Sequence, residues 1–433
     1  MQRRLGLGAA VAAAAGEAIG VGIFLTPAEM ARQLGSPFWL LLVWLLMGAM
    51  AVTGALCFGG LAAYFPEAGG TYVYLREAFG ARTAFLYGWM QLLVVDPGVT
   101  ASLAAGLAAY AAVAARLTPL EQKGLGVAAI AGLAAANIRG ARLGAAFLES
   151  LTWLKIGALA LLPAWAIALR LGSWSHFIPF MARRAASPPL SPALAASAMA
   201  AFYSFGGWWE AAKIAGEVRD PERVMPRALT LGVAAVTLVY ILVSGAFLYL
   251  VPIGGIEPGL TFMAQAGERL FGVAGSGVMV ALVGLCVLGS LAALVMLSPR
   301  VYFAMARDGL FFHQVAQVHP RFRTPARAIA VQAGLASLLV ALGTFEEIVA
   351  YFIFAAVCFL GLTVAGIFRA RRQETGARMP LRVPGYPFTP LAFLALVAGL
   401  LALLALHDPL QALCGAGVVL LGIPAFRLAR QAQ

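Results

Sequence analysis

Twelve residues near the start of the chain combine types that a lipid-facing helix does not tolerate. The stretch Gly16–Pro27 holds three glycines and the acid Glu17, inside an apolar run long enough to cross a bilayer. Glycine weakens a helix, and a carboxylate in hydrocarbon is costly. Because such a backbone is stable only where it lines a protected cavity, we expect the helix to break at Gly20-Val21-Gly22 and to present free N–H and C=O groups.

A second cluster of the same kind lies far along the chain. The stretch Phe202–Glu210 reads FYSFGGWWE and predicts a break at Ser204–Gly207, again close to an acid. Two broken helices at corresponding positions of two inverted halves indicate a binding site near the middle of the membrane. The alternative is that these glycines only permit close helix packing, and Gly16-x-x-x-Gly20 fits that interpretation.

Composition places the chain among polytopic helical membrane proteins. It is 62% hydrophobic and 11% charged, whereas soluble domains are about 25% charged. No long polar region exists, so we expect a single integral membrane domain over residues 1–433. The cysteines and histidines lack metal-ligand spacing, and we expect neither a metal nor a cofactor.

The apolar pattern predicts twelve membrane-spanning helices. Five precede the second break, an odd number, so the two halves would have opposite orientation. Repeat one covers about 1–172, repeat two about 190–370, and two further helices about 388–427. The expected spans are 6–31, 38–64, 83–113, 123–138, 146–170, 194–215, 226–251, 273–303, 326–344, 347–369, 388–406 and 410–427.

The net charge of +12 follows from topology rather than from a nucleic-acid partner. With the N-terminus in the cytoplasm, 22 of the 30 lysines and arginines fall in cytoplasmic segments or at the cytoplasmic ends of spans, and Lys155 is the only one placed inside hydrocarbon. Positive residues collect on the cytoplasmic side of membrane proteins. We therefore expect a multi-pass protein of the cell membrane with both termini in the cytoplasm.

Five short motifs occur along the chain: Ile19–Phe24, Pro66–Tyr72, Gly216–Arg223 with Pro226-Arg227, Ala306–Gly309 and Thr324-Pro325. At these motifs the chain resembles the amino acid–polyamine–organocation superfamily, and within it the bacterial amino acid permeases. The likeness covers nearly the whole chain and implies a LeuT-like fold of five plus five inverted helices with helices 1 and 6 broken. It also implies secondary amino acid transport by alternating access, through proton symport or amino acid exchange.

An amino acid substrate carries a carboxylate and an ammonium group on one carbon. The unpaired N–H groups where helix 1 restarts would bind the carboxylate, and the unpaired carbonyls before each break would bind the ammonium. The breaks themselves complete the expected site through Ser204 and Gly206. The expected N–H donors are Gly20, Val21, Gly22 and Ile23, and the expected carbonyl acceptors are Ala18, Ile19, Phe202 and Phe205.

Two side chains receive specific roles from the resemblance. Tyr203 occupies the position of an aromatic gate over the substrate, although an ordinary packed aromatic is the alternative. Lys155 matches the lysine of sodium-independent members, whose ammonium stands in for a sodium ion and bridges helices 1, 5 and 8. A lysine near the membrane edge that extends to water is the alternative for Lys155.

Three acids lie within the predicted spans. Glu17 is one turn before the first break and is the strongest candidate for coupling, while Asp96 and Glu210 are candidate charge partners. Each could pair with Lys155, bind a proton or contact a cationic substrate. The family motifs do not require an acid at Glu17 or Asp96.

Other functions remain to be weighed against amino acid transport. A transporter of polyamines or other organic cations on the same fold is favoured by the three acids. A membrane-embedded enzyme or sensor is the remaining class, but the sequence offers no nucleophile–base pair or phosphate loop. Beside the amino acid we expect protons and the lipid bilayer as partners. The loop from about Ala114 to Gly124 has no cysteine, so we expect no disulfide-linked heavy chain.

Overall fold

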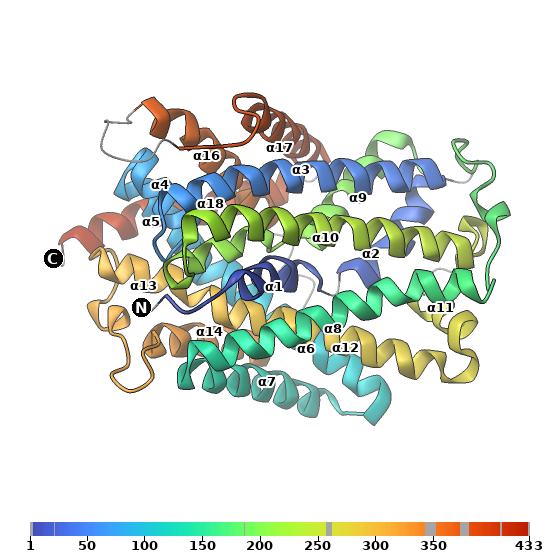
Figure 1. The fold of residues 1–433 in the computed structure, drawn as a ribbon, viewed down its shortest axis with the longest axis horizontal. Helices are drawn as coiled ribbons and strands as arrows, with labels where there is room; N and C mark the ends of the chain where they lie inside the picture. The colour runs from blue at the N-terminus through green and yellow to red at the C-terminus, as the bar shows by residue number, and fades with distance from the viewer. Residues whose placement is uncertain are drawn as a thin grey trace.

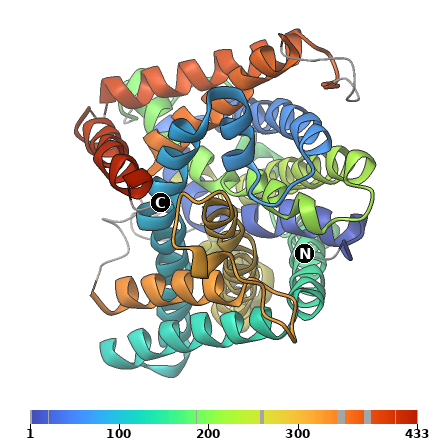
Figure 2. The ribbon, with the colours of Figure 1, turned by 90° about the vertical axis from the view of Figure 1, so that its left-hand side faces the viewer.

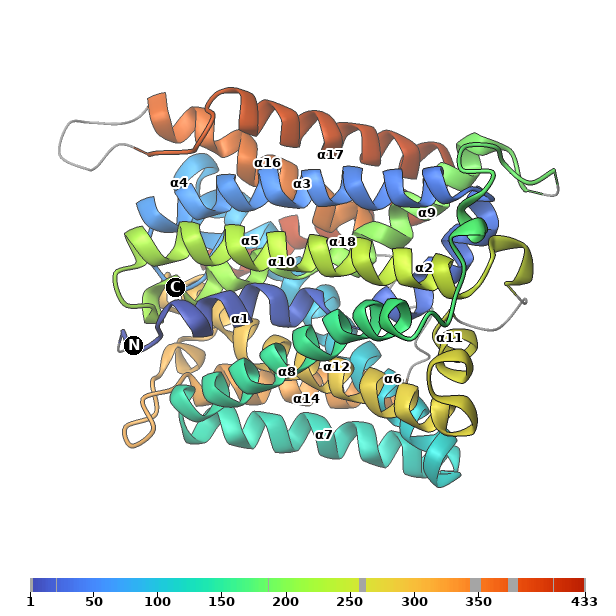
Figure 3. The same ribbon diagram turned by 45° about the vertical axis from the view of Figure 1, so that its right-hand side comes forward.

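The structure is a computed structural model that describes residues 3–20, 22–185, 187–256, 262–342, 352–372, 381–407 and 409–431. These residues form helices and connecting turns, and an isolated bridge between Leu5 and Val218 is the one β-type pairing among them. The helices run along one common direction, and both ends of the chain lie at the same end of the bundle (Figures 1 and 3). We refer to this end as the terminal end.

Ten helices of seventeen residues or more form most of the bundle. Figure 2 looks onto the terminal end and shows α7 and α14 along one side, with α17 and α18 on other sides of the molecule. The ten are α3 (Pro37–Tyr64), α6 (Asp96–Ala115), α7 (Pro119–Arg139), α8 (Ala141–Ala168), α10 (Pro221–Leu250), α12 (Gly275–Leu297), α14 (Ala326–Leu342), α16 (Phe352–Arg372), α17 (Phe388–His407) and α18 (Pro409–Gln431).

Shorter helices complete the fold. They are α1 (Leu7–Ala18), α2 (Gly22–Leu34), α4 (Thr71–Phe79), α5 (Ala81–Met90), α9 (Leu190–Phe205), α11 (Phe262–Phe271) and α13 (Pro299–Arg307). Short turns of tighter or wider helix lie between them: η1 (Gln91–Val95), η2 (Trp174–Phe177), η3 (Trp208–Glu217), η4 (Ile253–Gly255), η5 (Gly272–Ala274) and η6 (His313–Ala316).

Seven helices of the described chain are long and apolar enough to cross a membrane, and the bent pair α1–α2 makes eight. Two shorter apolar helices, Ala326–Leu342 and Gly415–Arg427, fall below that length. Length and composition therefore support a polytopic membrane protein. The expected number of twelve spans and the inverted repeat stay predictions, and the expected span at 347–369 begins outside the described residues.

Both predicted helix breaks are present. α1 ends at Ala18 and α2 begins at Gly22, with a bend of 43° between them. α9 ends at Phe205, Gly207 adopts a φ of 102°, and the chain continues as the 3₁₀ helix η3. Only glycine adopts such a left-handed conformation without strain, which explains why the second break falls at this residue. Val21 lies outside the described residues.

Gly22 also has a packing role. A Cβ at this position would lie 2.7 Å from Cα of Ser204, so α2 and α9 approach each other backbone to backbone. The Oγ1 of Thr26 and the Oγ of Ser204 form a hydrogen bond of 2.9 Å across this contact. Close packing and helix breaking are therefore combined at one glycine.

A third irregularity lies in the span formed by α5, η1 and α6. η1 is a π-helical turn, and α6 starts at Asp96 with Pro97 as its second residue. Proline lacks an N–H and cannot make the usual bond to the carbonyl four residues back, which favours such a turn. The turn places Gln91 and Asp96 beside the two broken helices.

Candidate functional site

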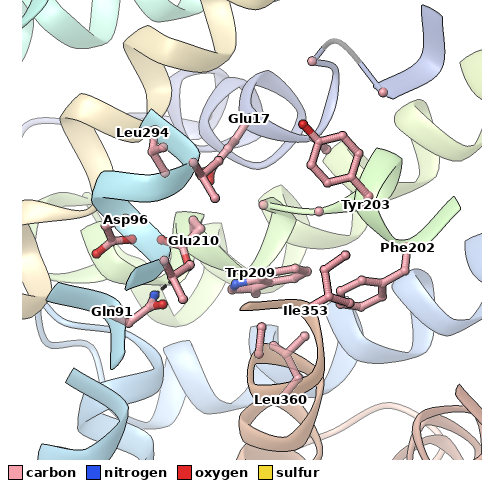
Figure 4. A pocket seen from close by; sticks show the side chains of 18 of the residues that line it. Glu17, Gln91, Asp96, Phe202, Tyr203, Trp209, Glu210, Leu294, Ile353 and Leu360 are labelled. Carbon is pink, nitrogen blue, oxygen red and sulfur yellow. Dashed lines mark hydrogen bonds between the residues drawn. The ribbon is translucent and has the colours of Figure 1, made fainter. Parts of the chain in front are cut away.

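The two breaks enclose a cavity of about 80 Å³ near the middle of the bundle (Figure 4). A buried water needs about 10–15 Å³ of such space, so the cavity holds several waters or the polar part of a small solute. Its wall includes Glu17, Ala18, Gly20 and Gly22 from the first broken helix, Phe202, Tyr203, Ser204, Gly206, Gly207, Trp209 and Glu210 from the second, and Gln91, Asp96, Leu294, Ile353 and Leu360 from neighbouring helices.

The cavity has two chemically different ends. Figure 4 shows the carboxylates of Glu17, Asp96 and Glu210 gathered on one side, and the rings of Phe202 and Tyr203 on the other, with Trp209 between them. Lysine and arginine are absent from the described residues of its wall. The site therefore joins an acidic end to an aromatic end.

Three of the expected backbone positions lie outside the cavity wall. Ile19 and Ile23 are fully buried, and Phe205 packs against Trp44 and Tyr240. The other expected backbone positions that the structure describes, on both broken helices, do line the cavity.

The expected carbonyl acceptors on α1 are already occupied in this conformation. Ile19 O accepts hydrogen bonds from Lys155 Nζ at 2.7 Å and from Ser290 Oγ at 2.9 Å. Ala18 O accepts from Tyr240 Oη at 2.7 Å and from the backbone N of Gly20 at 2.9 Å. Because the Gly20 N–H is already used in the bond to Ala18 O, it is not free to bind a substrate. The N–H groups without an intrahelical partner are therefore those of the first turn of α2, from Gly22 onward.

Lys155 lies fully buried in the middle of α8, which is where its sequence position predicts a buried lysine. Its ammonium donates to the carbonyls of Gly16 and Ile19 on the first broken helix, to Cys286 O at 3.5 Å and to Ser290 Oγ at 3.3 Å on α12. One cation thus joins α8, α1 and α12 through oxygen atoms alone. Its head group does not extend to the membrane edge.

Tyr203 and Phe202 come from the last turn of α9 and face the cavity from the side opposite the acids. Tyr203 is half-buried, and the Phe202 ring stacks on Trp209 with 5.9 Å between ring centroids. Trp209 therefore belongs to the cavity, a role that the sequence did not assign. Trp208 instead packs against Phe58 in the core.

A second buried lysine was missed by the sequence reasoning. We expected Lys155 as the one internal cation, with Asp96 and Glu210 among its candidate partners. The structure contradicts this, because Lys213 is 1% exposed and forms ion pairs with Glu210 and with Asp96, the latter at 3.4 Å. The charged stretch that follows it in sequence, residues 217–227, concealed its burial.

The Asp96 carboxylate is the centre of a wider polar network. Its Oδ1 also accepts a hydrogen bond from Ser298 Oγ at 2.9 Å, and its Oδ2 accepts from Tyr302 Oη at 2.7 Å. Glu210 Oε1 accepts from Gln91 Nε2 at 3.5 Å. These contacts tie the π-turn region to η3 and to α12–α13 directly beside the cavity.

Further ion pairs close the terminal end of the bundle beyond this network. Arg300 and Glu217 form a buried pair with 2.9 Å between Nε and Oε1. The Glu217 carbonyl also accepts from the backbone N of Arg4 at 2.8 Å, which ties the N-terminal segment to η3. Both Glu217 and its neighbours belong to the motif Gly216–Arg223.

Two other sequence motifs meet in a surface cluster at the same end. Arg76 pairs with Asp308 at 2.5 Å, and Arg307 pairs with Glu67 at 2.7 Å. Tyr72 donates to Asp308 Oδ2 at 3.0 Å; its burial, followed by the Asp308 charge, raises the pKa of this phenol. The pKa of Arg76 is raised although burial opposes it, because the bonds to Asp308 and Glu77 favour the charged form.

Metal-binding chemistry finds no support at this site. Among the residues that the structure describes, no group of three or more histidine, cysteine, aspartate or glutamate side chains could hold a metal ion. The chemistry on offer is hydrogen bonding and charge.

The sequence of residues 5–413 matches the family model described as amino acid permease. This chain belongs to the amino acid permease family. The family lies within the amino acid–polyamine–organocation superfamily, as the motifs predicted, and its members are transporters, not enzymes.

Curated relatives agree with this assignment. A serine/threonine exchanger from Bacillus subtilis (strain 168) is 29% identical over 98% of this chain and 96% of its own length. A human cystine/glutamate transporter is 26% identical over 99% of this chain and 85% of its own length. A human b(0,+)-type amino acid transporter is 26% identical over 89% of this chain and 79% of its own length. These relatives support amino acid transport by a multi-pass membrane protein.

Proposed function

We propose that this permease is a secondary active amino acid transporter that works by alternating access around the cavity between the two broken helices. The observation that carries the proposal is the pair of breaks at Gly20–Gly22 and Gly206-Gly207, whose glycines line one cavity. A helix N-terminus carries unpaired donors and a partial positive charge, so the start of α2 would bind the substrate carboxylate. Backbone recognition of this kind is independent of the substrate side chain.

Lys155 would serve as a fixed cation in this design. Its ammonium contacts four oxygen atoms on α1 and α12, a set of ligands that also suits a metal cation. A permanent charge at this position would hold the first broken helix against α8 and α12 without bound sodium.

The coupling mode follows from this arrangement in one of two ways. Glu17 could bind a proton in one stage of the cycle, which would give proton symport. Alternatively, the protein could change conformation only with an amino acid bound, which would give amino acid exchange. The Bacillus subtilis relative is a serine/threonine exchanger, and these two amino acids are the first solutes to test.

Transport of polyamines or other organic cations is the second candidate. The observation in its favour is that three acids and no basic side chain occur among the described residues of the cavity wall. Lys213 contacts two of these acids but its single charge offsets only one of them, so Glu17 is the acid without an ion pair that a cation would meet.

The transporter would need no disulfide-linked subunit, because the loop of about 114–124 carries no cysteine. The charge pattern would place both termini in the cytoplasm. Uptake of labelled L-serine into proteoliposomes, with and without a pH gradient and with and without internal L-serine, tests the function. Uptake that responds to neither would remove coupled transport from the proposal.

A further inference from the structure

The α1-side carbonyls expected to bind the substrate ammonium already have donors. Ile19 O accepts from Lys155 Nζ, and Ala18 O accepts from the backbone N of Gly20. Ser290 Oγ and Tyr240 Oη also lie within hydrogen-bond distance of these carbonyls, and each shares its single proton with other carbonyls. An ammonium group has three donors and needs an acceptor that is not yet filled. On α1, the side chain of Glu17 has such capacity, because it lines the cavity and its Oε2 has no hydrogen-bond partner among the described residues.

Glu17 reaches the cavity across the second break. Its side chain leaves the last turn of α1 and passes over Gly207, where a Cβ would lie 2.5 Å from Cγ of Glu17. Any other residue at position 207 would block this path. The carboxylate enters the cavity on the acidic side, toward Glu210 and Asp96 (Figure 4).

One oxygen of the Glu17 side chain lacks a partner within the described part of the chain. Its Oε2 atom is buried and has no hydrogen-bond partner there, and neither Lys155 nor Lys213 forms an ion pair with it. Lys213 instead pairs with Asp96 and Glu210, and its single charge offsets only one of these two carboxylates. A buried carboxylate without a partner is costly, so the arrangement is explained if a cationic group supplies that partner.

We propose that the Glu17 carboxylate binds the ammonium group of the transported solute. This inference rests on the proposed function and adds the residue that recognises the positive end of the substrate. The carboxylate of the solute then lies toward the start of α2, and the remainder of the solute lies toward Phe202, Tyr203 and Trp209 at the aromatic end. A charge-assisted bond of this type is about twice as strong as a neutral one.

The ammonium has two chemical sources, the α-amino group and an amine on the side chain. L-Serine has only the first, L-lysine has both, and putrescine has only an amine without a carboxylate. N-acetyl-L-serine keeps the carboxylate and has no ammonium. These four solutes therefore separate the sources.

The test compares transport by wild-type protein with that by Glu17→Gln and Glu17→Asp. Glu29→Gln is the matched control, because Glu29 lies on α2 with its side chain 50% exposed and contacts only its helix neighbours Arg32 and Gln33 among the described residues. We expect Glu17→Gln to raise the KM for L-serine and L-lysine by about tenfold or more, since a hydrogen bond to a charged group is worth that factor. Glu17→Asp should retain part of the affinity, and Glu29→Gln should leave KM unchanged.

A rise in KM for L-lysine and putrescine alone would also support the proposal and would assign the contact to the side-chain amine. In wild-type protein, N-acetyl-L-serine should fail to compete, a measurement that needs no folded variant. Unchanged KM values for every solute in folded Glu17→Gln, or competition by N-acetyl-L-serine equal to that of L-serine, would overturn the proposal. Wild-type liposomes that move none of these solutes would instead contradict the proposed function.

Discussion

Two lysines, Lys155 and Lys213, are buried near the cavity, and their surroundings differ. Lys155 contacts neutral oxygen atoms of the backbone and of Ser290 beside the first break. Lys213 contacts two carboxylates and forms an ion-pair cluster with them. The first arrangement suits the fixed cation that we propose, whereas the second links α6 to η3.

Replacement of Lys155 by alanine should reduce uptake at least about tenfold. The variant loses several hydrogen bonds from a charged donor and leaves the carbonyls of Gly16 and Ile19 without it. The measurement is initial uptake into proteoliposomes at matched protein content. Lys123→Ala is the control, because Lys123 is exposed and bonds only to Ala341 O among the described residues. A near-normal rate in Lys155→Ala would remove the assigned role.

Replacement of Lys213 by methionine should lower the stability of the folded protein. Loss of one partner from a buried ion pair costs about 3–5 kcal/mol, because it leaves uncompensated charge in the interior. Thermal unfolding in detergent should show a lower Tm, and the triple change Lys213→Met, Glu210→Gln and Asp96→Asn should restore part of it. Arg223→Met, an exposed site on α10, should leave Tm unchanged. An unchanged Tm in Lys213→Met would show that the ion pairs of Lys213 do not stabilise the folded protein.

The residue scale also shows how far the sequence could predict the site. Lys155 could be found because it lies within an apolar run, six residues after Glu149, the nearest charge. Lys213 lies three residues after Glu210 and just before a stretch of mixed charge, so its burial depends on η3 turning inward. The hydrogen bonds to the carbonyls of Ala18 and Ile19 come from Tyr240 and Ser290, which are distant in sequence. Nothing in the sequence pattern indicated that these two side chains lie beside the first break.

At the scale of the element, glycine both breaks and packs the helices of the site. Gly22 begins α2 and lets it contact α9 at the Ser204 backbone. The sequence located both breaks because clustered glycines and acids are unusual in a spanning helix. It did not locate the π turn at η1, since that turn follows from one proline and the packing of its neighbours.

Gly22→Ala should impair both folding and transport. The added methyl would lie 2.7 Å from Ser204 Cα, and overpacking of this kind costs about 1–3 kcal/mol. The expected result is a lower Tm together with reduced uptake. Gly132→Ala is the control, because nothing lies within 4 Å of a Cβ at that position on α7. Equal Tm and uptake in the two variants would show that the α2–α9 contact accommodates an added methyl group.

At the scale of the whole molecule, polar contacts are concentrated toward the terminal end. The Lys213 cluster, the Arg300–Glu217 pair and the Arg76–Asp308 pair follow one another from the cavity to the surface. Alternating access requires that such contacts separate when the cavity opens toward that side. The sequence motifs that identified the family are thus largely contacts of this closed end, while the expected inverted repeat stays a prediction.

The orientation of the molecule is testable with single cysteines in a background without the native four. Arg116→Cys lies in an exposed turn after α6, and Arg321→Cys lies in an exposed loop at the opposite, terminal end. We expect a membrane-impermeant thiol reagent to label Arg116→Cys in intact cells, and Arg321→Cys only after the membrane is disrupted. The reverse pattern would place the termini outside the cell.

The most direct test of the central claim is a comparison of labelled L-serine with its decarboxylated counterpart, ethanolamine, in proteoliposomes of the wild-type protein. If backbone N–H groups at the start of α2 bind the substrate carboxylate, L-serine should enter in a saturable manner, and ethanolamine should neither enter at a comparable rate nor compete with it. Equal transport of the two solutes would contradict the account, because the broken helix would then not recognise a carboxylate.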